Sequence, residues 1–437
     1  MQRTVKVIGG GLAGVEAAWQ LAKNGIQVEL FEMKPVKFSP AHTKETLAEL
    51  VCSNSLKAMR LESAAGLLKE EMRRFGSICM QAADVSRVDA GGALAVDRDK
   101  FSEKITELIE SNENIKLIRQ EVTEIPDGDV IVCAGPLASD KLSESIRNLC
   151  GDGLYFFDAA APIVTFESVN MEKAFTASRY DRGGEDDYIN CPMNKEEYEK
   201  FYTELVNGES AELHSFDKRK DVYEGCMPIE VMASRGADTM RFGPLKPVGL
   251  RDPRTGHRPW AVLQLRKEND RGTLYNLVGF QTNLKFPEQK RIFSLIPALE
   301  NAEFVRYGVM HRNTFINSPK LLNSDYSFRG RDNLFFAGQI TGVEGYMESA
   351  SSGILAGFNM ARRLSGLETA TLPETTMMGA LSRYISDESV KNFQPMGANF
   401  GVLPPIEPHI RDKKERYKAL ANRGINDLEK YLNEIRK

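Results

Sequence analysis

The apolar and polar positions at the start of the chain predict a strand, a helix and a second strand. Val5, Val7 and Ile8 form a short apolar run, residues 15–23 carry apolar side chains at helical spacing, and residues 26–31 form a second apolar run. Between the first strand and the helix lie six residues that include four glycines, Gly9-Gly10-Gly11-Leu12-Ala13-Gly14. This order of elements is typical of a parallel βαβ unit that binds a dinucleotide.

The glycine turn has the spacing Gly-x-Gly-x-x-Gly. In dinucleotide sites the first glycine permits a tight turn, the second lets the backbone approach a pyrophosphate, and the third lets the helix pack closely on the strand. Glu32 ends the second strand eighteen positions after Gly14, where a carboxylate can bind a ribose hydroxyl. A glycine turn without a ligand is the alternative, and the spacing does not separate FAD from NAD. The predicted cofactor residues here are Gly9, Gly10, Gly11, Leu12, Ala13, Gly14 and Glu32.

Two later segments repeat parts of this pattern. Residues 129–134 are a buried strand that ends at Gly135, a further candidate for contact with the cofactor. Residues 333–337 form another apolar strand, followed by Gly338, Gln339, Gly342 and a helix rich in small residues at 348–364. A second strand, turn and helix would complete an FAD site, although a ligand-free turn of the same sheet is possible. The three segments together favour FAD over NAD, and the absence of a second Gly-x-Gly-x-x-Gly argues against a separate NAD(P)H domain.

Between these segments the pattern predicts further elements and a change of domain. We expect one or two helices at 56–75, helices at 97–111 and 194–206, and strands at 260–265 and 274–280. The composition becomes more polar from about residue 166. The predicted fold class is α/β: a Rossmann-like FAD-binding domain of the glutathione-reductase type, with an inserted α+β domain. Its predicted parts are residues 1–165 and 311–437 for the first domain and 166–310 for the insertion.

Composition narrows the class of protein. The 437 residues are 42% hydrophobic and 27% charged, which is ordinary for a globular protein. No apolar run reaches the roughly 18 residues that cross a bilayer, and the chain enters its first strand without a signal-peptide pattern, so we expect a cytoplasmic protein without membrane contact. The six cysteines show neither Cys-x-x-Cys nor Cys/His spacing, and no metal site is predicted.

Charge is segregated along the chain, although the net charge is only −4. Residues 235–267 contain eight Lys and Arg residues against two acidic ones, and residues 411–437 contain nine against five. A basic segment of this kind can follow an RNA backbone or simply form a solvated face. The candidates for RNA contact are Arg235, Arg241, Arg251, Arg254 and Arg258.

Five motifs in order carry a resemblance to a known family. They are Gly-Gly-Gly-Leu-Ala-Gly at 9–14, Val-Cys-Ser-Asn-Ser at 51–55, Glu-Gly-Cys-Met-Pro-Ile-Glu at 224–230, Gln-Thr-Asn-Leu-Lys at 281–285 and Ala-Gly-Gln-Ile-Thr-Gly-Val-Glu-Gly-Tyr at 337–346. The chain resembles the folate- and FAD-dependent tRNA (uracil-5-)-methyltransferases, relatives of the glucose-inhibited division protein A family. The resemblance implies that 5,10-methylenetetrahydrofolate supplies the carbon, FAD carries it, NAD(P)H is the reductant and the T-loop uridine of tRNA becomes ribothymidine.

The chemistry implied by the resemblance gives two cysteines a role. Uracil C5 is a poor nucleophile until a group adds at C6, and a thiolate is well suited to that addition. We predict Cys226 as the nucleophile, since a turn between Gly225 and Met227-Pro228 would expose its sulfur. Cys52 matches the family's other functional cysteine, as a proton acceptor, a partner of the flavin or a guard of the carrier. Asn283 and Lys285 match a family motif and are candidates for folate or flavin contact.

Three other functions remain open at the level of sequence. The nearest is the related FAD and folate protein that modifies a tRNA wobble uridine. A flavin oxidoreductase that acts on a small molecule is a different class, against which the basic segment and the two matched cysteines count. A non-catalytic RNA-binding flavoprotein is the third. The sequence predicts neither the oligomeric state nor a preference for NADH or NADPH.

Overall fold

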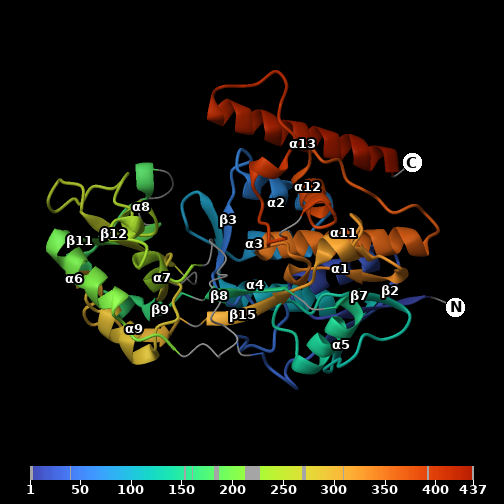
Figure 1. Cartoon of the computed structure of the whole chain (residues 1–437), viewed down its shortest axis with the longest axis horizontal. Coiled ribbons are helices and arrows are strands. Elements are labelled where there is room, and N and C mark those ends of the chain that lie inside the picture. Colours follow the sequence, from blue (N-terminus) through green and yellow to red (C-terminus); the bar gives the residue numbers. More distant parts are fainter. Residues whose placement is uncertain are drawn as a thin grey trace.

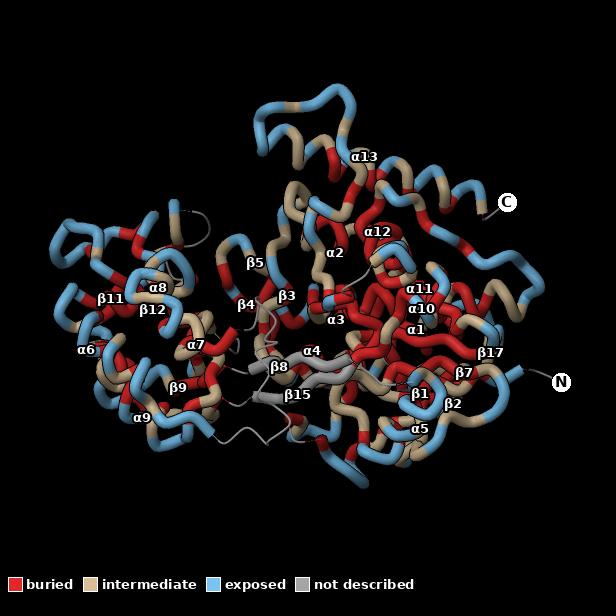
Figure 2. Tube along the Cα trace, in the orientation of Figure 1, coloured by how far each residue is buried: buried red, intermediate tan, exposed pale blue. Residues whose placement is uncertain are grey.

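The computed structural model describes residues 3–39, 41–151, 154–159, 161–181, 187–211, 227–267, 272–308, 310–390 and 393–435. Side chains are described for these residues except 154–159, 181 and 310–314. Two hydrophobic cores hold the chain together, one in each of two bodies that lie side by side in Figure 1. Figure 2 shows the buried residues concentrated inside each body, with exposed residues along the outer helices.

The larger core surrounds a six-stranded sheet with the order β16-β17-β7-β1-β2-β6. Five of its strands are parallel: β1 (Thr4–Ile8), β2 (Gln27–Glu32), β6 (Ile115–Arg119), β7 (Asp129–Val132) and β17 (Arg331–Phe336). The sixth, β16 (Ser327–Phe328), pairs antiparallel with β17. β1 pairs with β2 on one side and with the later strand β7 on the other, so the strand order reverses at β1. Ligands of such sheets bind beyond the carboxyl ends of the strands at this reversal.

Two helices that follow glycine turns pack against each other in this Rossmann-like domain. They are α1 (Leu12–Lys23) and α11 (Tyr346–Leu364). Gly353 and Gly357 of α11 lie so close to the backbone of Ala13 and Ala17 in α1 that a Cβ at either glycine would overlap it. Gly353 meets Ala13, and four residues later Gly357 meets Ala17, so the two helices run in the same direction. The small residues at 348–364 therefore bring two helices together.

The chain leaves this domain and returns to it along a two-stranded ribbon. β8 (Leu154–Ala159) and β15 (Met310–Phe315) pair antiparallel over their whole length. The part of the chain between these two strands forms an antiparallel sheet of the order β10-β11-β12-β13-β9-β14. Its strands are β9 (Ile163–Thr165), β10 (Phe175–Thr176), β11 (Tyr188–Met193), β12 (Ala261–Lys267), β13 (Leu274–Leu277) and β14 (Phe304–Arg306). We call this body the insertion domain.

The helices of the insertion domain cover its sheet. They are α6 (Lys195–Val206), α7 (Ile229–Ala233), α8 (Thr239–Phe242) and α9 (Phe286–Phe293). Asn194 begins α6 with a capping box, in which its side chain accepts from the Glu197 N–H and the Glu197 carboxylate accepts from the Asn194 N–H. β9 already belongs to this sheet, just before the predicted boundary at residue 166; the domain boundaries themselves stay predictions.

A small sheet connects the two domains. It consists of β3 (Ser55–Ala58), β4 (Arg87–Val88) and β5 (Ala93–Val96). At the turn before β5, Ala90 accepts a hydrogen bond from the Tyr188 hydroxyl at 3.1 Å and Asp89 lies 3.5 Å from Lys267. The other helices of the Rossmann-like domain are α2 (Ala64–Arg74), α3 (Ile78–Val85), α4 (Arg98–Glu110), α5 (Asp140–Cys150), α10 (Ser318–Leu321), α12 (Met377–Tyr384) and α13 (Lys413–Ile435). Figure 1 shows α13 lying across the top of the domain, next to α12 and α2.

The Rossmann-like α/β fold predicted from the sequence is confirmed, with one correction among its elements. The helix expected from residue 56 begins only at Ala64, because residues 55–58 form β3. Leu56 is buried in the main core, and one apolar residue at this position is compatible with a strand as well as with a helix. The other expected helices at 97–111, 194–206 and 348–364 are present within a few residues of their predicted ends.

Candidate cofactor and catalytic site

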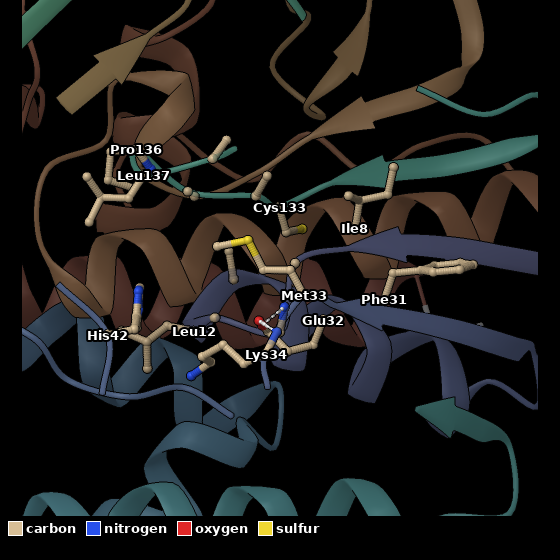
Figure 3. A pocket seen from close by; sticks show the side chains of 18 of the residues that line it. Ile8, Leu12, Phe31, Glu32, Met33, Lys34, His42, Cys133, Pro136 and Leu137 are labelled. Carbon is tan, nitrogen blue, oxygen red and sulfur yellow. Dashed lines mark hydrogen bonds between the residues drawn. The ribbon is translucent and has the colours of Figure 1, made fainter. Parts of the chain in front are cut away.

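A cavity of about 1110 Å³, including the part open to solvent, lies at the carboxyl ends of β1, β2, β7 and β17. A parallel sheet of this kind binds its ligand at this edge. Nine predicted cofactor residues line it, namely Gly9, Gly10, Gly11, Leu12, Ala13, Glu32, Gly135, Gly338 and Gln339. Three turns that are far apart in the sequence therefore meet at one cavity, part of which is seen in Figure 3.

The glycines of the first turn differ in what surrounds them. A Cβ at Gly11 would meet no atom within 4 Å, so this position is an open part of the cavity wall. A Cβ at Gly14 would overlap the carbonyl oxygen of Gly9, so the third glycine serves the packing of α1 on the sheet and does not line the cavity. Gly9 has a φ of +104°, a conformation that favours glycine. These are the roles that the spacing predicts for a pyrophosphate-binding turn.

Two helices begin at the cavity. Leu12 and Ala13 of α1 and Tyr346 and Ser349 of α11 belong to its wall. The N–H groups in the first turn of a helix have no partner within the helix, and the helix dipole makes this end partly positive. Both helix starts therefore favour an anionic group in the cavity, as the phosphates of a dinucleotide require.

Glu32 is held in place by two backbone groups. One carboxylate oxygen accepts from the Gly10 N–H at 2.9 Å and the other from the Lys34 N–H at 2.9 Å. Figure 3 shows this carboxylate beside Met33 and Lys34. Two carboxylate oxygens have about four acceptor positions, so two remain for a ligand hydroxyl. The side chain is only 7% exposed, which fixes its direction.

Cys52 lies beside the cavity, between two elements of the Rossmann-like domain. Its neighbour Val51 and the aromatic residue Tyr346 both line the cavity. The Tyr346 hydroxyl oxygen lies 3.0 Å from the Cys52 sulfur and accepts from the N–H groups of Cys52 at 2.8 Å and Ser53 at 3.2 Å. Burial, and then the neighbouring Cys52, raise the pKa of Tyr346 well above its ordinary value. Tyr346 therefore stays protonated and fixes the position of Cys52.

The insertion domain also holds the segment that contains Cys52. Arg266 of β12 donates from Nε to the Asn54 side-chain oxygen at 3.0 Å and from Nη2 to the Ser53 hydroxyl at 2.8 Å. The Asn54 amide in turn donates to the Lys267 carbonyl at 2.8 Å. Asn54 is fully buried and Arg266 is 7% exposed. Hydrogen bonds between buried polar groups are costly to break, so these contacts lock the two domains together directly after Cys52.

Two more arginines bind the residues that precede Cys52. Arg98 at the start of α4 donates to the Leu50 carbonyl at 2.7 Å, and Arg306 of β14 donates to the Val51 carbonyl. Arg306 belongs to the insertion domain, as Arg266 does. Three guanidinium groups thus hold the Cys52 segment through hydrogen bonds to its backbone and side-chain oxygens.

Comparison with known proteins identifies the family of the chain. The family model described as "Glucose inhibited division protein A" matches residues 4–368. The chain belongs to the glucose inhibited division protein A family. It is similar to a protein of Acetivibrio thermocellus named methylenetetrahydrofolate–tRNA-(uracil-5-)-methyltransferase TrmFO, with 63% identity over 430 residues that cover 98% of each chain. A protein of the same name from Halalkalibacterium halodurans is 54% identical over 432 residues, which cover 99% of each chain.

A solved structure from the glucose inhibited division protein A family has the same fold. GidA of Aquifex aeolicus superimposes with a TM-score of 0.70 at 17% identity, over 100% of this chain and 76% of that chain. At this identity the likeness concerns the fold alone. It confirms the fold class predicted from the sequence, and the relatives named above confirm the predicted resemblance.

Not all of the predicted site residues line the cavity: Gly14 and Cys52, described above, do not. Cys226, the predicted nucleophile, lies outside the described residues. Gly342 has a φ of +84° and lies against the ring of Phe393, where a Cβ would overlap the ring, so it serves packing instead of lining the cavity. Asn283 and Lys285 do not line the cavity either. Lys285 lies 2.7 Å from Glu209, and the Asn283 N–H donates to the Glu230 carboxylate at 2.8 Å.

Burial also shifts the pKa of two other titratable groups at the cavity, Cys133 and His42. Cys133 at the end of β7 is buried, which raises the pKa of its thiol, in agreement with its interpretation as a core residue. Burial and the nearby Lys34 lower the pKa of His42, which lines the cavity. Among the described residues, no group of His, Cys, Asp and Glu side chains is arranged to hold a metal ion. In the same part of the chain, no helix is long and apolar enough to cross a bilayer.

Sequence reasoning did not single out the residues that hold Cys52. Tyr346 closes one of the family motifs, but its spacing from Cys52 gives no sign that the two meet. Arg266 and Arg306 stand in strands of another domain, and the charge count over residues 235–267 treats Arg266 only as part of a basic segment. The one available signal is in β12, where Arg266 directly continues the mostly apolar run at 261–265, which indicates a buried charge with a partner.

Proposed function

We propose that this protein methylates C5 of the T-loop uridine of tRNA, producing ribothymidine. In this proposal 5,10-methylenetetrahydrofolate supplies the carbon, FAD carries it and NAD(P)H supplies electrons. The identity of 63% over nearly the whole chain to a protein named for this reaction is the observation that carries the proposal. The cavity lined by three glycine turns supports it from the structure. Because the proposed substrate is tRNA, the proposal also places the protein in the cytoplasm.

FAD fits the cavity in chemical terms. The start of α1 and the open wall at Gly11 would receive the pyrophosphate, and Glu32 would accept from a ribose hydroxyl. Gly135, Gly338 and Gln339 would line the flavin half, beside the start of α11. Bound there, FAD supplies the transfer of the one-carbon unit and its reduction.

The protein must supply a nucleophile and a proton acceptor. We propose that the thiolate of Cys226 adds to uracil C6, which breaks the C5–C6 double bond and places negative charge on C5 and the C4 oxygen. After C5 has gained its carbon substituent, it must lose its proton, and expulsion of the thiolate restores the double bond. Cys52 is our candidate for the acceptor of this proton, because it lies beside the cavity and Tyr346 holds it there.

The test is a direct product assay. The FAD-loaded protein is incubated with tRNA transcribed without modifications, methylenetetrahydrofolate labelled at its methylene carbon, and NADH; the nucleosides are then identified by mass. We expect labelled ribothymidine, and none when S-adenosylmethionine replaces the folate. A modified wobble uridine, or no labelled nucleoside, would refute the proposal.

Three cysteine variants assign the roles. Cys226→Ala should abolish ribothymidine formation while the protein keeps its FAD, and Cys52→Ala should do the same. Cys150→Ala is the matched control, because Cys150 ends α5 away from the cavity and burial raises the pKa of its thiol to about 12. Full activity in Cys226→Ala would refute the assigned nucleophile but not the reaction.

A further inference from the structure

The insertion domain presents one aromatic side chain almost entirely to solvent. Phe242, the last residue of α8, is 82% exposed. Its neighbour Met240 is fully buried in the core of the insertion domain, so the backbone that carries Phe242 is anchored. A phenylalanine gains nothing for folding in this position, since its ring remains in water. A single exposed apolar side chain does not by itself indicate a partner, so the case for contact at Phe242 depends on the groups around α8.

The position of α8 connects Phe242 with the proposed chemistry. α8 packs against α7, and the buried Met240 shares a core cluster with Ile229 and Ala233 of that helix. The described chain before α7 begins with Met227, which is buried and follows Cys226 directly in the sequence. An RNA base on Phe242 would therefore lie on the element next to the segment that leads to the proposed nucleophile.

Phe242 has basic residues next to it in the sequence and in the loop that adjoins α8. Its neighbour Arg241 lies over the ring of Trp260, 3.7 Å from its centroid, and donates to the Trp260 carbonyl at 3.0 Å. The loop that ends at Trp260 thus adjoins α8. Arg251, His257 and Arg258 of that loop line an open hollow of about 1050 Å³.

Some of these cations are already paired, and others are available. Arg241 pairs with Asp238 at 2.6 Å, and Arg254 pairs with Asp252 at 2.6 Å. The exposed basic residues of the segment that form no ion pair with another described residue are Arg235, Lys246, Arg251 and Arg258. An exposed ring on α8 and such cations in the adjoining loop are together complementary to single-stranded nucleic acid, whose bases stack on aromatic rings while its phosphates bind Lys and Arg.

We propose that Phe242 stacks on an unpaired base of the tRNA loop that contains the target uridine, while Arg251 and Arg258 bind phosphates of the same arm. This inference rests on the proposed function and adds a surface to it. The occupant is an RNA loop, because unpaired bases expose the flat faces that a single ring can bind. A protein partner would require a wider apolar patch around the ring.

Substitutions at Phe242 distinguish aromatic stacking from burial of apolar area as the source of tRNA affinity. Phe242→Ala and Phe242→Leu both remove the aromatic face, whereas Leu keeps most of the apolar area; Phe242→Trp keeps a stacking surface. We expect both Ala and Leu to raise the dissociation constant for unmodified tRNA by roughly 5- to 150-fold, since stacking is worth about 1–3 kcal/mol per base. Trp should restore the affinity. The visible spectrum of bound FAD should be the same in all variants.

The salt dependence of tRNA affinity distinguishes the contribution of the Phe242 ring from that of the arginines. Arg251→Gln and Arg258→Gln should each lower the slope of log affinity against log salt by about 1, whereas Phe242→Ala should leave the slope unchanged. Val206→Ala is the matched control, because Val206 is a 41% exposed apolar residue at the end of α6 in the same domain. It should bind tRNA as the unsubstituted protein does.

Two results would overturn the inference. One is wild-type tRNA affinity in both Phe242→Ala and Phe242→Leu. The other is a change of oligomeric state in these variants by light scattering without a change in tRNA affinity, which would make the ring part of an interface between two copies of the chain. Either result, with ribothymidine formation intact, leaves the proposed function standing. Absence of ribothymidine in the unsubstituted protein would reject that function instead.

Discussion

The hydroxyl oxygen of Tyr346 lies 3.0 Å from the sulfur of Cys52, although 294 positions separate the two residues in the chain. The same oxygen accepts from two backbone N–H groups, those of Cys52 and Ser53. A phenolic oxygen has two lone pairs, and both are used, so its own proton is directed to the sulfur. A hydroxyl that donates to sulfur stabilises a thiolate more than a thiol. Tyr346 is thus a positioning residue for Cys52.

Removal of this hydroxyl should make Cys52 less reactive. In Tyr346→Phe the ring stays and the donor is lost. We expect the alkylation rate of Cys52, followed by mass spectrometry of its peptide, to need a pH about one to two units higher to reach the same value, because a hydrogen bond to a charged group contributes about 1.5–3 kcal/mol. Tyr384→Phe, which removes a hydroxyl that donates to the Gln394 carbonyl, is the control. An unchanged pH profile in Tyr346→Phe would contradict the assignment.

The guanidinium of Arg266 donates two hydrogen bonds to the Cys52 segment, so its removal should make that segment more mobile. A lysine in its place cannot donate to Ser53 and Asn54 together, because an ammonium lacks the planar pair of donors. In Arg266→Lys we expect faster hydrogen exchange in residues 51–58 and a lower thermal midpoint, since the fully buried Asn54 loses a partner. Arg147→Lys, at an exposed position of α5, should change neither. Equal exchange in both variants would show that the Arg266 contacts do not hold this segment.

Three glycine-to-alanine changes separate cofactor binding from packing. In Gly353→Ala the new Cβ would overlap the backbone of Ala13, so α11 must move away from α1, and we expect both a lower thermal midpoint and loss of FAD. In Gly11→Ala the Cβ meets no protein atom but enters the cavity, so FAD affinity should fall while the midpoint of the FAD-free protein stays unchanged. Gly92→Ala also meets no atom, lies outside the cavity and should leave both properties unchanged.

Flavin absorbance and thermal unfolding of the FAD-free proteins measure these two effects. If Gly11→Ala bound FAD as tightly as the unsubstituted protein, the pyrophosphate would not lie on the first glycine turn. If Gly353→Ala left the midpoint unchanged, the close approach of α1 and α11 would not be needed for the fold.

The parts of the fold that could be predicted from the sequence are those with local signals. The first βαβ unit is found because a strand period, a helix period and the glycine turn follow one another within 32 residues. The helix predicted at 194–206 is α6, and the structure shows that Asn194 and Glu197 form a capping box at its start. The strand β3 differs from the predicted helix, because four residues are too few to show either a strand period or a helix period.

The parts that could not be predicted depend on contacts between distant segments. Nothing local in the sequence shows that Arg266 reaches Asn54, 212 positions away, or that Tyr346 meets Cys52. Gly338 reaches the cavity and Gly342 does not, although four positions separate them in one glycine-rich motif. The difference arises from Phe393, whose ring fills the space next to Gly342. Motifs therefore locate the cavity, whereas the residues that hold Cys52 are seen only in the structure.

Glu71 should make stability fall as the pH rises. It is fully buried, and its two oxygens accept from the N–H groups of Met377 and Met378 at the start of α12, at 2.7 Å and 2.8 Å. Burial raises its pKa from 4.5 to about 8 despite these donors. Between these two values the folded state binds more protons than the unfolded state, so the contribution is full below about pH 4.5 and is lost as the pH rises to about 8. The largest slope is about 1.4 kcal/mol per pH unit.

The variant Glu71→Gln isolates this contribution, because the amide does not titrate. We expect the thermal midpoint of the unsubstituted protein, relative to that of Glu71→Gln, to decrease steadily between pH 5 and pH 8. Burial also raises the pKa of Glu16, to about 7, but this group is present in both proteins and cancels in the difference. The exposed Glu144→Gln should give a difference that does not vary with pH. A midpoint difference for Glu71→Gln that stays constant or increases over this range would show that Glu71 is ionised throughout, with the N-terminus of α12 outweighing burial.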